Sequence, residues 1–135
     1  MQYGIRKLAN PTGTSAVVRF LCLFSVMAGA ALAGTWSGAL VDAGCYQSAK
    51  NNRNAYDLPG VRDVNMDIRG CAPKAKTHSF AIVLPNSEDF VLDAAGNSQA
   101  AQLVRQEVGK NPLRVTVNGE MRNEIIAVSS IAREP

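Results

Sequence analysis

The sequence predicts a mainly β domain with one helix: a five-stranded, partly open barrel in which the helix connects the third and fourth strands. Two observations favour this fold class. Five segments of strand-like composition follow residue 34, and one helical pattern separates the third from the fourth. About 100 residues remain after the N-terminal segment, which is enough for one domain with a single core.

The N-terminal segment 1–33 has the pattern of a secretory signal peptide. Arg6, Lys7 and Arg19 precede an uncharged apolar run that ends in a small-x-small cleavage site, Ala31-Leu32-Ala33. The run has about 14 apolar residues, fewer than the roughly 20 that a membrane-spanning helix needs. We therefore expect cleavage after Ala33, a secreted or periplasmic protein, and a mature domain of residues 34–135 without a membrane span.

Loss of this segment makes the domain electrically neutral. The whole chain carries a formal charge of +3, and without the three cations of the segment its 14 Lys and Arg fall to 11, which equals the 11 Asp and Glu. A neutral domain lacks the overall basic field with which proteins bind nucleic acids. We therefore expect no nucleic-acid partner.

Two cysteines remain, Cys45 and Cys71, and an even number in an oxidising compartment predicts one disulfide. Closure of a loop of about 27 residues would stabilise the fold by roughly 3–4 kcal/mol. The alternative is a metal-handling or thiol redox protein that uses both cysteines with His78, the only histidine. The paired ligand spacings and the CxxC motif typical of such proteins are absent, so we expect no cofactor.

Alternation and turn residues place the elements. The expected strands cover residues 35–42, 79–84, 89–93, 113–121 and 124–131. A helix capped by Asn97 or Ser98 runs to Val108 and ends at Gly109. A helix between the third and fourth of five strands is the order of an OB-fold.

The turn of the last hairpin has two candidate positions. Asn118-Gly119 is the stronger local turn signal. A turn at Arg122-Asn123 instead pairs Val117 with Val128 and Gly119 with Ile126, which aligns apolar residues on one face. We expect the second position, with Gly119 at a bulge or bend.

Residues 45–77 are expected to form a long loop, because they are rich in Asn, Asp, Arg and Gly and have little apolar periodicity. The loop has a local charge of +3, which the rest of the mature domain balances. Two tyrosines lie among the cations, and OB-folds bind ligands through the loop after the first strand. The candidate binding residues are Tyr46, Lys50, Arg53, Tyr56, Arg62, Arg69, Lys74 and Lys76.

Two segments carry a resemblance to known proteins. They are TWSGALVDAGC at residues 35–45 and the closing pattern V-x-V-x-G followed by I-x-V-x-x-I, between Val115 and Ile131. The chain resembles small secreted or periplasmic bacterial proteins that open with W-x-G-x-[LIV]-x-D-x-x-C, a largely uncharacterised family. The resemblance implies an OB-like fold and an exported protein. The chain departs from it after Cys71, where no further cysteine follows.

No constellation in the sequence supports catalysis. His78 could serve Ser79 or Ser48, but a lone histidine beside a strand start is typical of an ordinary surface residue. We expect Asp42 to be a turn carboxylate that accepts backbone hydrogen bonds, and Trp36 to lie in the core. The sequence predicts a non-enzymatic, envelope-associated binding module, whose ligand is an anionic or carbohydrate polymer or a protein partner.

Overall fold

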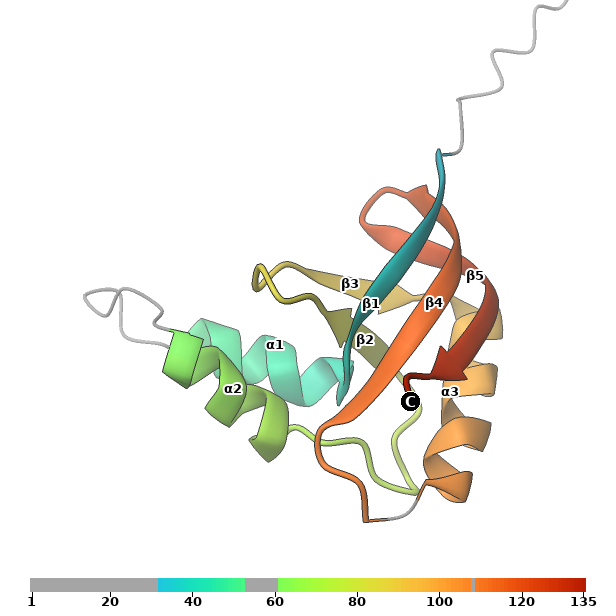
Figure 1. Cartoon of the computed structure of the whole chain (residues 1–135). Coiled ribbons are helices and arrows are strands. Elements are labelled where there is room, and N and C mark those ends of the chain that lie inside the picture. The colour runs from blue at the N-terminus through green and yellow to red at the C-terminus, as the bar shows by residue number, and fades with distance from the viewer. Residues whose placement is uncertain (1–31, 53–60, 108) are drawn as a thin grey trace, which may run out of the picture.

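Figure 1 shows the computed structural model of the chain, which describes residues 32–52, 61–107 and 109–135. Most of the predicted signal peptide, residues 1–31, lies outside the described residues. Leu32 and Ala33 are the exposed first residues of the first strand. The elements are β1 (Leu32–Asp42), α1 (Ala43–Asn52), α2 (Val61–Gly70), β2 (Phe80–Val83), β3 (Asp89–Leu92), α3 (Ala94–Gln106), β4 (Leu113–Arg122) and β5 (Ile125–Arg133).

The strands close into a barrel in the order β1-β2-β3-β5-β4. Neighbouring strands are antiparallel except β3 and β5, which run parallel and pair through Val91 with Ile125 and Leu92 with Ile126. The helix α3 connects β3 to β4, as the sequence predicts. The five-stranded OB-like barrel is therefore confirmed.

The barrel interior holds the main hydrophobic core. Leu113, Val115 and Val117 are buried at every second position of β4, because successive side chains of a strand point to opposite faces. Ala100 of α3 is fully buried in the same cluster, and Trp36 packs half-buried against it. The inward side of the barrel thus follows the predicted alternation.

The prediction of a single helix is wrong, because the segment expected to be a loop contains α2 and most of α1. The helix α2 buries Val64 and Ile68 four residues apart, with Asp63 in its first turn and Arg69 in its last. In α1 the one buried side chain is Tyr46. Because α1 and α2 have few apolar residues, and these lie among Asn, Asp and Arg, the helical period is hard to recognise in the sequence.

The two helices build a second core on the outer face of the barrel. Its members come from β1, α1, α2, β2 and the residue after α2, and are Ala39, Val41, Tyr46, Val64, Ile68, Cys71, Ala81 and Val83. Because both faces of β2 are covered, all four of its residues are buried and its sequence is uninterruptedly apolar. Burial against the barrel therefore stabilises two helices that are too short to persist alone.

Where β3 and β5 separate, α3 and its cap supply hydrogen-bond partners to β5. The Asp93 carboxylate caps α3 by accepting from the N–H of Gly96 at 2.8 Å, and it also accepts from the N–H of Val128 at 3.2 Å. Farther along, the Gln99 side-chain oxygen accepts from the N–H of Ile131 at 3.2 Å. Side chains thus replace the missing strand partner of β5.

The turn between β4 and β5 lies at Asn123-Glu124, one residue beyond the predicted Arg122-Asn123. Both turn residues have positive φ, 49° at Asn123 and 64° at Glu124. This is the type I′ combination, whose twist matches that of the flanking strands. Strand twist therefore selects the position of the turn, although Glu124 has a Cβ that makes such a φ unfavourable.

The displaced turn also corrects the predicted register. Val117 lies opposite Ile131 and Gly119 opposite Val128, instead of Val128 and Ile126 respectively. Moving the turn by one residue shifts the register by two, which accounts for the new partner of Gly119, and the bulge between Asn118 and Gly119 adds one more residue for Val117. The bulge at Gly119 is confirmed, because the register shifts directly before it and a side chain there would collide with the β5 backbone.

We predict that Asp93→Ala lowers the free energy of unfolding by about 2–3 kcal/mol, because it removes the α3 cap and leaves the Val128 amide without its acceptor. Asp93→Asn keeps an acceptor oxygen and should cost less than about 1 kcal/mol. Urea denaturation followed by circular dichroism measures both variants. Equal losses would contradict this role of the carboxylate.

We predict that Glu124→Gly raises the free energy of unfolding by about 0.5–1 kcal/mol, because glycine adopts positive φ without a Cβ clash. Glu120→Gly, at an extended position of the same hairpin, is the matched control and should destabilise. Thermal denaturation compares the two. A lower melting temperature for Glu124→Gly would mean that backbone strain is not the dominant cost at this turn.

Candidate functional site

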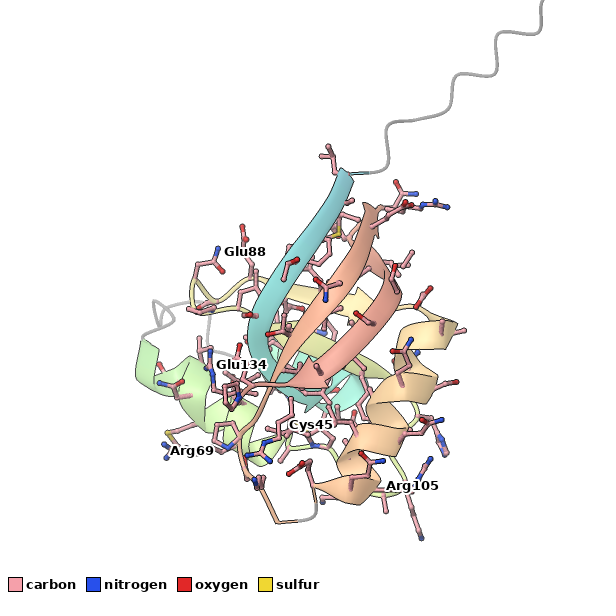
Figure 2. All side chains as sticks on the ribbon, turned by 45° about the vertical axis from the view of Figure 1, so that its right-hand side comes forward. Cys45, Arg69, Glu88, Arg105 and Glu134 are labelled. Carbon is pink, nitrogen blue, oxygen red and sulfur yellow. A yellow bond between two sulfur atoms is a disulfide. The ribbon has the colours of Figure 1, made fainter. Side chains whose placement is uncertain are left out.

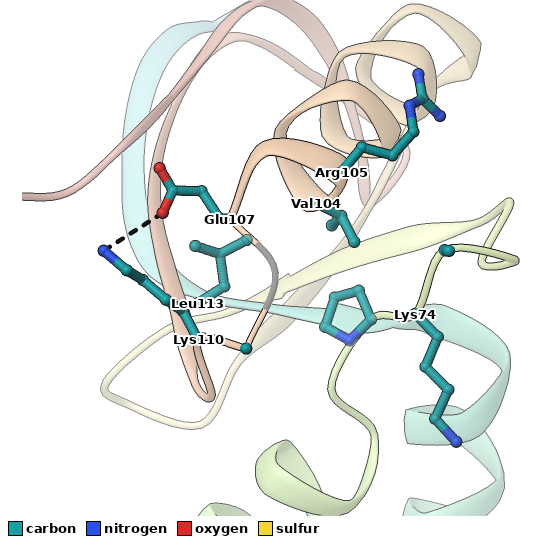
Figure 3. A pocket seen from close by; sticks show the side chains of 9 residues that line it. Lys74, Val104, Arg105, Glu107, Lys110 and Leu113 are labelled. Atoms are coloured by element: carbon teal, nitrogen blue, oxygen red, sulfur yellow. Dashed lines mark ion pairs between the residues drawn. The ribbon is translucent and has the colours of Figure 1, made fainter.

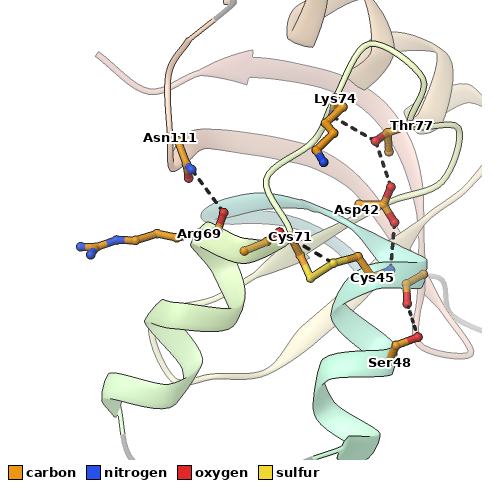
Figure 4. The surroundings of a disulfide bond; sticks show 10 residues. Asp42, Cys45, Ser48, Arg69, Cys71, Lys74, Thr77 and Asn111 are labelled. Atoms are coloured by element: carbon orange, nitrogen blue, oxygen red, sulfur yellow. Dashed lines mark hydrogen bonds between the residues drawn. A yellow bond between two sulfur atoms is a disulfide. The ribbon is translucent and has the colours of Figure 1, made fainter.

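The predicted disulfide joins the first turn of α1 to the end of α2 (Figure 4). Cys45 and Cys71 are bonded, with their Cα atoms 5.5 Å apart. Beside the bridge, the backbone N–H of Asp42 donates to the Cys71 carbonyl oxygen at 2.9 Å. Covalent and hydrogen bonds therefore fix the end of α2 to the end of β1.

The Asp42 side chain organises the same place. Its Oδ1 accepts from the Cys45 N–H at 3.0 Å, and its Oδ2 accepts from the Thr77 hydroxyl at 2.9 Å. The hydroxyl oxygen of Thr77 in turn accepts from the backbone N–H of Lys74 at 3.0 Å. The prediction that Asp42 is a turn carboxylate accepting backbone hydrogen bonds is thus confirmed. We call Asp42, Thr77 and the Cys45–Cys71 bridge the Asp42 joint.

The structure separates the predicted binding residues. Tyr46 is only 1% exposed, so, contrary to its predicted role, it presents no ring to a ligand at the surface. The ammonium of Lys50 lies 2.5 Å from the Asp89 carboxylate and connects α1 to β3. Outside the described residues lie Arg53, Tyr56 and the side chain of Arg62.

The other three candidates lie near one end of the barrel. Arg69 is in the last turn of α2, and Lys74 and Lys76 are exposed in the segment that follows Cys71. The 109–112 segment reaches the same place, because the side-chain amide of Asn111 donates to the Arg69 carbonyl oxygen at 3.2 Å.

Arg105 and Lys110 border a pocket together with Lys74. They are not among the binding residues that the sequence predicts. They belong to α3 and the segment after it, more than 25 residues away in the chain, and only the tertiary fold brings them to the loop. The structure thus combines cations from three segments, whereas Arg69 and Lys76 do not line this pocket. We call Lys74, Arg105 and Lys110 the basal surface.

The pocket within the basal surface is apolar and has a volume of about 240 Å³ (Figure 3). Val104, Leu113 and Pro73 are among the residues that line it. In Figure 3 the charged ends of Lys74 and Arg105 point away from the pocket. The cations therefore surround an apolar recess and leave it unfilled.

Glu107 also lines this pocket, and its negative charge is paired with two cations. Its carboxylate lies 3.2 Å from Arg133 and 3.3 Å from Lys110. Burial favours the neutral acid, but hydrogen bonds and positive charge from Arg133 and Lys110 outweigh burial and hold the pKa of the Glu107 carboxyl below its ordinary value. Glu107 therefore stays ionised at neutral pH and offsets part of the charge of Lys110.

A second, more open cavity of about 620 Å³ lies between α1, the β2–β3 turn, β3 and the β4–β5 turn. Glu88, Val91, Glu124 and Ile125 are among its lining residues, and we call it the distal hollow. Glu88 and Arg105 lie at opposite ends of the molecule in Figure 2. The acidic hollow and the basal surface are therefore separate places.

The described residues also test the alternative metal or thiol redox site. Within residues 32–52, 61–107 and 109–135, no three His, Cys, Asp or Glu side chains form a group that could hold a metal ion. The sulfurs of Cys45 and Cys71 are bonded to each other, so they offer His78 no thiolate partners. In the same ranges, no helix has the length and apolar character needed to span a membrane.

Comparison with protein-family models, curated proteins and solved structures finds no match for this chain.

Proposed function

We propose that the exported protein is a non-enzymatic binding module of the cell envelope, and that its basal surface binds an anionic carbohydrate polymer. The observation that carries this proposal is the convergence of Lys74, Arg105 and Lys110, from the 71–79 segment, α3 and the segment after α3, around one pocket. The Asp42 joint supports this arrangement, because it holds the turn that contains Lys74 beside the barrel.

The arrangement favours an extended ligand over a single small anion. The charged ends of Lys74 and Arg105 point outward from the pocket and so suit charges spaced along a chain. Val104 and Arg105 of the last turn of α3 line the pocket, and the C-terminal end of a helix disfavours a negative charge close to it. An apolar sugar face fits the recess lined by Val104 and Leu113, while acidic substituents contact the surrounding cations.

The expected affinity is modest. Exposed ion pairs contribute about 0.2–1 kcal/mol each. The three basal cations, of which Lys110 is partly neutralised by Glu107, therefore supply at most about 3 kcal/mol, which corresponds to a Kd of roughly several millimolar for one segment of polymer. A long polymer offers many such segments and raises the apparent affinity. Weak, repeated, salt-sensitive contacts agree with a role in attachment to the envelope.

The compartment and the family are part of the same proposal. The signal-peptide pattern of residues 1–33 supports export, and the Cys45–Cys71 disulfide is compatible with an oxidising compartment. We also propose that the chain belongs with the small exported OB-like proteins that share its W-x-G-x-[LIV]-x-D-x-x-C opening.

We predict that the protein purified after export binds polygalacturonate, and that Lys74→Gln/Arg105→Gln weakens this binding about tenfold, because two surface ion contacts of about 0.5–1 kcal/mol each are lost. Isothermal titration calorimetry at 50 and 300 mM salt measures the effect, which should shrink at high salt. Neutral dextran should not bind.

The matched control is Arg114→Gln/Arg122→Gln, which removes the same charge from two exposed residues of β4. It should change the affinity less than twofold. An equal loss in both double variants would show that net charge alone governs binding and would refute the basal surface as the site.

A further inference from the structure

We propose that the distal hollow is a docking site for an extended, basic segment of a protein partner, in which apolar residues and Lys or Arg alternate at every second position. The proposal is independent of the basal surface, because the two places share no lining residue. It adds a second binding function to the domain.

Three parts of the chain converge at the hollow. The helix α1 contributes Gln47 and Lys50, the β2–β3 turn contributes Ser87, and the β4–β5 turn contributes Asn123. The volume of about 620 Å³ falls within the range of about 300–1,000 Å³ typical of ligand sites. The neutral polar side chains of Gln47, Ser87 and Asn123 can donate and accept hydrogen bonds with the main chain of a peptide.

The hollow exposes an apolar pair. Val91 of β3 and Ile125 of β5 are direct neighbours across the parallel pairing and are 38% and 44% exposed. Among the described residues, the other large exposed hydrophobic side chains are Leu32 and Met66, which do not line the hollow. Two adjacent exposed aliphatic side chains inside one cavity are a feature typical of a binding surface.

The negative charge of the hollow favours a positively charged ligand. Lys50 and Asp89 neutralise each other at 2.5 Å. Glu88 and Glu124 are both exposed, and neither forms an ion pair within the described ranges 32–52, 61–107 and 109–135. The hollow therefore carries two uncompensated negative charges beside its apolar pair, which attract a cationic ligand and repel the anionic polymer proposed for the basal surface.

The combination favours a peptide over a small amine. A small amine would neutralise one carboxylate and leave Val91 and Ile125 in contact with water. An extended peptide points successive side chains to opposite faces, so every second side chain lies on one face, about 7 Å from the next. Cations and apolar residues that alternate at every second position can therefore reach both the carboxylates and the aliphatic pair. Peptides that bind barrels and sheets in this way use side-chain pockets for specificity.

The test is titration of the exported, ¹⁵N-labelled protein with the synthetic octapeptide Lys-Ser-Val-Ser-Lys-Ser-Val-Ser, which places Lys and Val on one face of an extended chain. We expect amide shifts confined to α1, the β2–β3 turn, β3 and the β4–β5 turn. Glu88→Gln/Glu124→Gln should weaken binding about tenfold, with a smaller effect at high salt. The same peptide with Glu in place of Lys should not bind, and the same peptide with Ser in place of Val should bind several-fold more weakly.

Matched controls separate the site from general charge and hydrophobicity. Ile125→Ser should weaken binding at least threefold, whereas Met66→Ser, at an exposed apolar residue outside the hollow, should leave it unchanged. Glu134→Gln removes one negative charge elsewhere and should also have no effect. The Gln variants conserve side-chain shape, so they test the charge even if Ile125→Ser impairs folding.

Three results would overturn the proposal. The shifts could map to the basal surface, or the controls could weaken binding as much as the hollow variants. The third is self-association of the free protein that Glu88→Gln/Glu124→Gln abolishes, because the occupant would then be a second copy of this chain. Loss of polygalacturonate binding in the basal variants leaves the peptide result unaffected, so the two proposed functions fail separately.

Discussion

The Asp42 carboxylate and the disulfide beside it connect two structures that would otherwise be independent. One oxygen of Asp42 caps α1, the other holds Thr77, and the bridge fixes the end of α2 to the same point. The barrel closes without these contacts, because its interior core comes from the strands and α3. The α1–α2 insertion has only a small core of its own against β1 and β2, so it depends on the joint for its position.

The barrel was predictable because its physical signals are strong and local. Alternation along β4 and β5, the glycine at the bulge and the breaker at Gly109 each constrain the chain over a few residues. The α1–α2 insertion was missed because its helices bury few apolar side chains. The spacing of Val64 and Ile68, between Asp63 and Arg69, was nevertheless a readable helical signal.

The candidate site was predictable only in part, for a different reason. The local positive charge of residues 45–77 predicts Lys74 as a binding residue, but no local pattern indicates that Arg105 and Lys110 share its pocket. The sequence also predicts Tyr46 to be an exposed aromatic residue, whereas its side chain is buried and covers the outer face of β1 and β2. Sites assembled from several segments follow from topology, which periodicity does not specify.

The two ends of the molecule carry opposite charge, although residues 34–135 have no net formal charge. The neutrality excludes a general polyelectrolyte role but allows two specific surfaces of opposite sign. At the β4–β5 turn, Glu124 lines the acidic hollow although the positive φ at this position favours glycine.

The most direct test of this account compares polygalacturonate binding by the wild-type protein and Cys45→Ala/Cys71→Ala, with hydrogen exchange of both. We predict that barrel amides such as those of Val115 and Val117 remain protected, that α1 and α2 lose protection, and that affinity falls several-fold because Lys74 is no longer held beside Arg105. Unchanged affinity with an unprotected insertion would contradict the claim that the Asp42 joint assembles the basal surface.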